Sequence, residues 1–476
     1  MDEPARLDST PQEIADQLRQ SEGDPRRRIL IRGATVLTLE SSTPDLTCGD
    51  IYIHGSRIHE VRPHTPDYTP PDGTIVVPAE GCIALPGLQD THRHSWQAQL
   101  RRMLAGVDLD EYIEVILGII SPHYRPEDIY AATILSDLGA INTGITTVMD
   151  FAHNTRTPDH GTASLEAHGK SGIRHVVAIA PMLTGEREKQ WPENVTRMVA
   201  EGGYGSGSLG TLRLGVFGSP DLAPQQFVLS PENIALARDL GLSIIADATF
   251  GSAAAATITE LGQGGHLGPD VTLIHCTALD DTAWRWIADT GTRVSVSTTS
   301  DAEIGIHGAN PPIQRALAQG IRFGLGVDVE CSLSSDLFAQ MRATYTIQRM
   351  QAFAARYRGA EEPGPVNCGR IVEMATADGA ATNGLSTVTG ALAAGKAADI
   401  VVVNATDLNN IPLNNAYATI VLGADSSSVR DVFVGGNVRK WHGEVLGVDL
   451  TRLTAMVNNS RDYLLDRSDR AVNLFD

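Results

Sequence analysis

Residues 85–94 read Leu-Pro-Gly-Leu-Gln-Asp-Thr-His-Arg-His, a stretch that predicts a buried strand ending in two histidines, His92 and His94. Side chains at positions i and i+2 of a strand lie on the same face. Two imidazoles that face one point can bind a borderline divalent cation such as zinc. The alternative is a pair of surface histidines on an edge strand, and the sheet to which the strand belongs decides between the two interpretations.

In the middle of the chain, predicted strands and helices alternate. After the first strand come seven more short β-branched runs with helical texture between them: ITTVMD, RHVVAIAP, LRLGVFGSP, LSIIADAT, VTLIHCTAL, TRVSVST and IRFGLGVDV. Eight such units over about 300 residues favour an α/β fold of the (β/α)₈ TIM-barrel type. A doubly wound sheet is the alternative, but it usually carries a phosphate loop, and we find no credible one. We therefore predict a barrel over residues 87–385.

Both ends of the chain have a different texture, with short strands separated by glycine turns. ILIRGATVLTLE at residues 29–40 is one example, and VRDVFVGGNVRKWHGE near the other end is another. We expect residues 29–86 and 386–447 to form one small β-sandwich-like domain. Residues 1–28 are expected to be an N-terminal arm, and residues 448–476 a polar C-terminal helix. That helix could pack on a second subunit, so a homo-oligomer is a hypothesis.

Composition narrows the classes of function. Lys plus Arg number 37 and Asp plus Glu number 57, which gives a formal charge of −20. This charge argues against nucleic acid and anionic membranes as partners. No apolar run reaches the ~18–20 residues of a membrane span, and the first residues, MDEPARLDSTPQE, do not resemble a secretory signal. With five scattered cysteines, we expect a cytoplasmic protein with a small-molecule substrate.

Other chemically capable side chains fall where predicted strands end. His153 follows the second strand, His275 closes the sixth, and Asp328 closes the eighth, while Glu303 and His307 come just after the seventh. Active sites of such barrels lie at the carboxyl ends of the strands. Any one of these residues could instead be a structural polar group bonded to the backbone. Their shared position is what predicts a site.

The motifs LPGLQDTHRH, LIHCTAL, LGVD and GALAAGKAADIVVVN together resemble the amidohydrolase superfamily, in particular its cytosine deaminase/chlorohydrolase-like branch. The resemblance covers roughly residues 29–447. It implies metal-activated water that attacks an sp² carbon bearing nitrogen or another leaving group. In that scheme His92 and His94 are metal ligands, and Asp328 binds the metal and moves the proton of the water. His275 orients or polarises the group under attack.

The fifth strand departs from the family pattern. Asp247 stands where the family has a histidine ligand, and Phe250 stands where its deaminases have a glutamate. Asp247 can still bind a divalent metal through oxygen, but Phe250 cannot transfer a proton. Around the seventh strand, Glu303 or His307 could take over that transfer if the loop folds inward.

We therefore predict a metal-dependent hydrolase that acts on a C–N bond, other than a peptide bond, or on a similar polar bond. One divalent ion is expected, with zinc as the first choice and iron or manganese as alternatives. Two alternatives stay open: a non-hydrolytic lyase, dehydratase or cyclase on the same scaffold, and a catalytically inactive relative. The candidate residues are His92, His94, Asp247 and Asp328 as ligands, His275 and Asp328 as catalytic groups, and His153, Glu303, His307 and Trp96 as substrate contacts.

Overall fold

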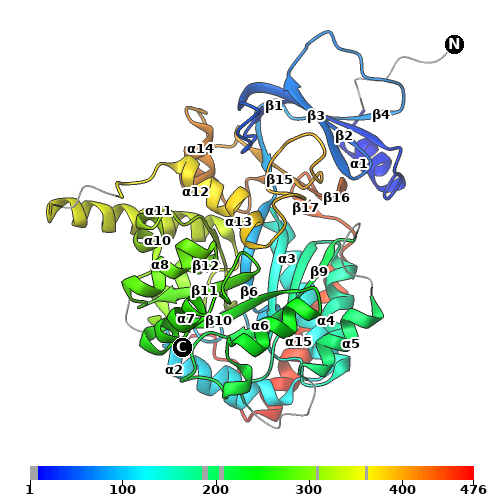
Figure 1. Cartoon of the computed structure of the whole chain (residues 1–476). Helices are drawn as coiled ribbons and strands as arrows, with labels where there is room; N and C mark the ends of the chain where they lie inside the picture. The colour runs from blue at the N-terminus through cyan, green and yellow to red at the C-terminus, as the bar shows by residue number, and fades with distance from the viewer. Residues whose placement is uncertain (1–8, 185–190, 203–207, 307–309, 360–362, 476) are drawn as a thin grey trace.

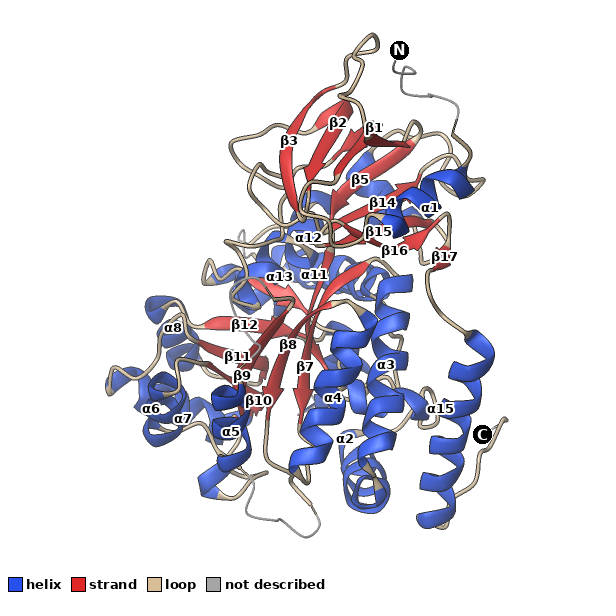
Figure 2. Cartoon of the chain, turned by 90° about the vertical axis from the view of Figure 1, so that its right-hand side faces the viewer, coloured by secondary structure: helices blue, strands red, loops and turns tan. Residues whose placement is uncertain are grey.

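The computed structural model describes residues 9–184, 191–202, 208–306, 310–359 and 363–475. Two sheets organise this part of the chain, an eight-stranded parallel sheet and a nine-stranded mixed sheet (Figure 1). The first sheet, with its helices, makes a (β/α)₈ barrel, as the sequence predicts. The second is built from strands near both ends of the chain, and it lies to one side of the barrel (Figure 2).

In the barrel each strand pairs in parallel with the next strand along the chain. The first and last strands meet through a bridge between Arg93 and Asp328, which brings the ends of the sheet together. Such strands are buried on both faces, which explains their nearly continuous apolar runs. The strands are β6 (Leu88–Arg93), β7 (Ile145–Ala152), β8 (Arg174–Ile179), β9 (Gly210–Phe217), β10 (Ser243–Phe250), β11 (Val271–Thr277), β12 (Arg293–Val296) and β13 (Phe323–Leu325).

Helices surround the barrel and bury their apolar faces against it. Trp284 on α8 is 1% exposed within the same core as strands β11 and β12. The helices of this layer are α3 (Pro126–Asn142), α4 (Pro158–Ser171), α5 (Glu193–Glu201), α6 (Pro231–Asp239), α7 (Gly251–Gln263), α8 (Asp281–Thr290), α9 (Thr298–Glu303), α10 (Ile313–Ala318), α11 (Leu337–Tyr357), α12 (Cys368–Ala375) and α13 (Ala377–Thr382).

The second sheet joins segments far apart in the sequence, because β5 pairs antiparallel with β14. The sheet is mixed rather than purely antiparallel, since β1 pairs in parallel with β4 and β5. Helix α1 (Pro11–Gln20) covers part of it with Ile14, Ala15 and Leu18 buried. The strands are β1 (Arg28–Val36), β2 (Leu46–His54), β3 (Arg57–Pro63), β4 (Thr74–Pro78), β5 (Cys82–Pro86), β14 (Ile400–Asn404), β15 (Val429–Val434), β16 (Asn437–Trp441) and β17 (Glu444–Val445).

Gly87 is the point at which the chain passes from one sheet to the other. β5 ends at Pro86 in the small sheet, and β6 begins at Leu88 in the barrel. A Cβ on Gly87 would lie 2.0 Å from Oγ1 of Thr146 on β7, so only glycine fits this crossing. The small sheet therefore adjoins the amino ends of the barrel strands, and the opposite end of the barrel is free to hold a site.

Long connections cover that opposite end. After β6 the chain forms η1 (Ser95–Leu100), α2 (Leu109–Tyr112), a π-helical turn η2 (Ile113–Ile120) and η3 (Ser121–His123). The terminal helix α15 (Leu450–Arg467) packs nearby, with the Arg125 guanidinium 3.6 Å from the ring centre of its Tyr463. The remaining short elements, η4 (Gln225–Phe227), α14 (Ala416–Ala418) and η6 (Thr419–Gly423), lie in connections elsewhere.

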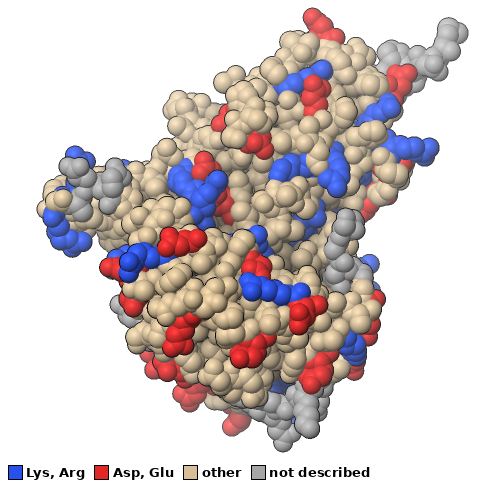
Figure 3. All heavy atoms as spheres, viewed as in Figure 1, with Lys and Arg blue, Asp and Glu red and all other residues tan. Residues whose placement is uncertain are grey.

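Acidic and basic side chains are interspersed on the face drawn in Figure 3. None of the described helices is both long enough and apolar enough to cross a membrane.

Candidate metal centre

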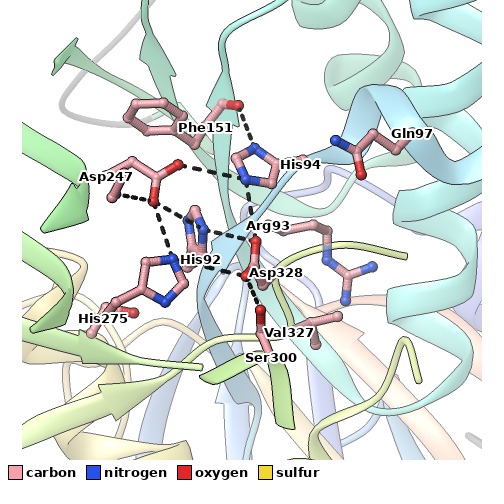
Figure 4. Close-up of polar contacts among 12 residues, drawn as sticks. His92, Arg93, His94, Gln97, Phe151, Asp247, His275, Ser300, Val327 and Asp328 are labelled. Atoms are coloured by element: carbon pink, nitrogen blue, oxygen red, sulfur yellow. Dashed lines mark hydrogen bonds and ion pairs between the residues drawn. The ribbon is translucent and has the colours of Figure 1, made fainter. Parts of the chain in front are cut away.

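Five polar side chains from four strands converge at the carboxyl end of the barrel (Figure 4). His92 lies in β6 and His94 directly follows it, Asp247 lies in β10, His275 lies in β11, and Asp328 follows β13. All five residues are at most 6% exposed. The sequence placed each of them at a strand end, and the fold brings those ends together.

The ligand-type atoms of this group are close to one another. Asp328 Oδ1 lies 3.1 Å from Nε2 of His92 and 3.2 Å from Nε2 of His94. Asp247 reaches the same two histidines with its two carboxylate oxygens, at 3.6 Å and 3.5 Å. Four ligands held about 2.1 Å from a tetrahedral zinc ion are separated by about 3.4 Å. The spacing therefore fits a small divalent cation.

The hydrogen bonds of the two β6 histidines also fit a metal. Neither ring nitrogen of His92 has a hydrogen-bond partner, although the side chain is fully buried. Nδ1 of His94 lies 3.2 Å from the carbonyl oxygen of Phe151, to which it can donate, and this leaves Nε2 for the cluster. Metal-binding histidines commonly fix their tautomer through such a contact with a backbone carbonyl. A bound cation would be shared by Nε2 of His92 and Oδ1 of Asp328, which lie 3.1 Å apart without the geometry of a hydrogen bond.

Helix α9 supplies two side chains that hold the other members of the cluster. Asp301 Oδ1 lies 2.8 Å from Nδ1 of His275, whose Nε2 lies 3.3 Å from Asp247 Oδ1. The hydroxyl of Ser300 donates to Oδ2 of Asp328. Asp301 and Ser300 therefore fix the orientation of one imidazole and one carboxylate.

Burial and charge act in opposite directions on the two carboxylates. Burial alone would raise the pKa of Asp328, but His92 and His94 outweigh it and hold that pKa well below its usual value. The pKa of Asp247 is also lowered against its burial, through His92 and His275. Both carboxylates are therefore ionised at neutral pH, and ionised oxygens are what a divalent cation needs.

A buried ionic network lies behind the two β6 histidines. Arg93 donates from Nε to Asp90 and from Nη1 to Glu330, each at 2.7 Å. Glu330 also accepts from Arg101 and from Ser136 of α3. Asp90 Oδ1 in turn accepts from the backbone nitrogens of His92, at 3.2 Å, and of Val327, at 3.0 Å. The network ties the end of β6 to the segment that carries Asp328.

Two members of the cluster have an unusual backbone. His275 has φ of 73° and Asp328 has φ of 68°, in the left-handed region that non-glycine residues rarely adopt. Such strained residues concentrate at functional sites, where the surrounding structure holds them.

The predicted substrate contacts have different outcomes. His153 lines a cavity over the cluster, and its ring centre lies 4.4 Å from that of His94. Trp96 packs behind His153, with ring centres 5.3 Å apart, and is not among the cavity-lining residues. Glu303 is exposed and does not line the cavity either, so the structure gives no support to its expected role. His307 lies outside the described residues.

Sequence reasoning missed several residues that hold the site. Arg93 stands inside the quoted motif, and Glu330 follows Asp328 by two positions, yet neither pattern indicated an ion pair. Asp301 and Ser300 also had no predicted role, although they stand just before Glu303, which had one. The position of Asp301 just after β12 was the available signal for a role in the site. Its partner, His275, is brought next to it only by the fold.

Comparisons with known proteins find related sequences and related folds. Residues 231–439 match the model of the amidohydrolase family. A 5′-deoxyadenosine deaminase of Methanosarcina mazei is 24% identical over 451 residues, which cover 92% of this chain and 99% of that protein. A 5-methylthioadenosine/S-adenosylhomocysteine deaminase of Desulfitobacterium hafniense is 27% identical over 444 residues, covering 90% of this chain and 96% of the relative.

Solved structures share the fold. A triazine hydrolase variant superposes with a TM-score of 0.78 at 21% identity, covering 92% of this chain and all of the other. A zinc-bound adenosine deaminase from Xanthomonas campestris gives a TM-score of 0.77 at 18% identity, covering 93% of this chain and all of the other. The strand-end motifs, the barrel and these relatives agree, and residues 231–439 match the amidohydrolase family.

Proposed function

We propose that this protein is a metal-dependent hydrolase that cleaves a C–N bond, other than a peptide bond, or a similar polar bond of a small molecule. The cofactor in this proposal is one divalent cation, with zinc as the first choice. The observation that carries the proposal is the convergence of five buried ligand-type side chains, with Nε2 of His92 and Nε2 of His94 each within 3.2 Å of Asp328 Oδ1. Zinc in the structural relative from Xanthomonas campestris supports the choice of metal.

Each residue has a role in the proposal. His92, His94, Asp247 and Asp328 hold the cation, which supplies Lewis-acid activation of water at neutral pH. Asp328 accepts the proton of the attacking water and passes it to the leaving nitrogen. Its Oδ2 is oriented for this by the hydroxyl of Ser300.

His275 orients the group under attack. Asp301 holds its Nδ1, so Nε2 faces the ligand cluster and the cavity. A donor at Nε2 stabilises negative charge that develops on the substrate. Asp247 Oδ1 lies 3.3 Å from the same Nε2, so this nitrogen adjoins a ligand of the proposed cation.

Metal content and turnover test the proposal together. We expect zinc-supplemented protein to hold one zinc per chain by elemental mass spectrometry and to release ammonia or amine from members of a panel of amides, cyclic amides and amino-heteroarenes. His92→Ala should lose both properties while keeping the wild-type circular dichroism spectrum. His54→Ala, an exposed histidine of β2, is the matched control and should keep both. A metal-replete and active His92→Ala protein would contradict the ligand assignment.

The presence of Phe250 in the cavity favours a second candidate, a non-hydrolytic reaction. Phe250 lines the cavity where the family's deaminases carry a glutamate, so this side of the substrate has no proton donor. A lyase, dehydratase or cyclase on the same scaffold would work without that donor. Turnover in oxygen-18 water separates the two classes, since hydrolysis places the label in the product and elimination or rearrangement does not.

A further inference from the structure

The cavity above the cluster has an almost wholly apolar wall. Residues in or after all eight barrel strands line it, and its volume is about 60 Å³. Apolar side chains make up most of the lining beyond the ligand group, among them Leu109, Ile113, Leu117, Phe217, Phe250 and Ile304. Among the described lining residues there is no lysine, arginine or glutamate. A charged substituent placed there would lose its hydration without gaining a partner.

The polar groups of the lining are nearly all engaged. The hydroxyl of Ser300 donates to Asp328, and the hydroxyl of Tyr112 accepts a 2.7 Å bond from Gln97. Asp247, His94, His275 and Asp328 form the cluster itself. This leaves few groups that could recognise the hydroxyls of a sugar or a carboxylate of the substrate.

His153 is the exception among these polar side chains. It is 3% exposed and lines the cavity, and neither of its ring nitrogens has a hydrogen-bond partner. A buried imidazole without a partner is costly unless a ligand completes it. Because its ring lies 4.4 Å from that of His94, the ligand group it can reach is the one nearest the proposed metal.

We propose that the substrate is a compact, uncharged molecule that is apolar outside its reacting group, and that His153 hydrogen-bonds the reacting end. The volume offers room for roughly four water-sized positions, at about 15 Å³ each. A charged tail on the substrate would meet the same apolar wall. This inference rests on the metal-dependent hydrolase proposed above and specifies what that enzyme accepts.

Hydroxamates with different tails can test whether the cavity prefers an apolar tail, and the substrate does not have to be known. Acetohydroxamate, butyrohydroxamate and succinic monohydroxamate carry the same zinc-binding group and differ only in the tail. On zinc-loaded protein, calorimetry should show butyrohydroxamate binding about 15-fold more tightly than acetohydroxamate, because each buried methylene contributes about fourfold. Succinic monohydroxamate, which ends in a carboxylate, should bind at least about tenfold more weakly than butyrohydroxamate.

A pair of matched variants locates the effect in the cavity. Leu109 and Leu104 are both half-buried leucines of the same connection, but only Leu109 lines the cavity. Leu109→Arg should tighten succinic monohydroxamate by about tenfold or more and weaken butyrohydroxamate, since a charged hydrogen bond replaces apolar contact. Leu104→Arg should leave both affinities as they are in the wild type.

His153→Leu tests the polar contact separately. It should weaken all three hydroxamates by a similar factor, about two- to twelvefold, without changing the tail preference or the zinc content. Unchanged affinities in this variant would overturn the role of His153.

The outcomes separate this inference from the function beneath it. If the charged tail binds as tightly as the apolar one while acetohydroxamate still binds, the apolar-substrate inference is wrong and the metal site stands. If zinc does not bind, the proposed function fails first.

Discussion

His168 offers a sharp test of the buried electrostatics described by this structure. Its imidazole lies on α4 between two carboxylates, with Nδ1 2.9 Å from Asp137 Oδ2 and Nε2 3.2 Å from Asp150 Oδ2. Asp150 also accepts a hydrogen bond from the backbone nitrogen of Ser95, directly after His94. Burial would lower the pKa of His168, but Asp137 and Asp150 outweigh it and raise the pKa to about 10.

The sign of the effect follows from that shift. A histidine whose pKa is higher in the folded state stabilises the fold fully below its unfolded pKa of about 6.5. The contribution is lost as the pH rises through the folded value of about 10. With RT of about 0.59 kcal/mol, linkage gives about 4 kcal/mol at pH 7 and about 1.4 kcal/mol at pH 9. The stabilisation by His168 therefore falls by about 2–3 kcal/mol over two pH units.

The variant His168→Asn removes the cation and leaves its two carboxylates unpaired. Urea unfolding followed by tryptophan fluorescence at pH 7, 8 and 9 should show the gap between wild type and variant narrowing by about 2–3 kcal/mol. His59→Asn, which changes an exposed histidine of β3, should show a small and constant gap. A His168→Asn gap that stays constant or widens toward pH 9 would refute the assignment of a buried imidazolium.

Three further predictions concern the barrel and its centre. Glu330→Gln should lower the free energy of unfolding by about 3 kcal/mol at pH 7 in urea titrations, because Arg101 and Arg93 overcome burial and hold the pKa of Glu330 at about 2. This loss should shrink as the pH falls from about 4.5 toward 2, and a pH-independent loss would contradict it. Gly87→Ala should lower the melting temperature because the added Cβ clashes with Thr146. Adding Thr146→Ala to this variant should restore part of the melting temperature. If nothing is restored, the crowding between residues 87 and 146 is not the cause. Removal of metal with a chelator should lower the melting temperature, and added zinc should restore it. Free zinc at a thousandfold excess over its dissociation constant should stabilise the folded state by about 4 kcal/mol. An unchanged melting temperature would argue against a metal site in the folded state.

Much of the barrel could be predicted because its signals are local. Each strand is a short apolar run ended by a polar residue, and all eight runs became barrel strands. The quoted stretch 85–94 was predicted as one strand, with the boundary of the barrel placed at residue 87; in the structure β5 ends at Pro86 and β6 begins at Leu88. That division depends on pairing with β14, more than 300 residues away, which no local pattern reveals.

The members of the cluster could be predicted because the sequence indicates where each strand ends. Parallel strands in a barrel bring their carboxyl ends together, so His92, Asp247 and Asp328 could be placed near one another. The contact of Asp301 with His275 depends on the short helix α9, and the exposed position of Glu303 depends on where that helix ends. Connections of this kind are set by packing with other connections rather than by their own sequence.

The contact between β6 and β13, the first and last strands of the barrel, has a consequence for folding during synthesis. Arg93 and Glu330 are 237 positions apart, and both are buried when paired. While the ribosome is still adding the residues between them, Arg93 has no distant carboxylate, and His92 has neither Asp247 nor Asp328. Until β13 has been synthesised, β6 has no partner on one side, and such an open edge can pair with other chains. The proposed metal site likewise needs residues from both ends of the barrel sequence, so it is complete only after β13 has been synthesised.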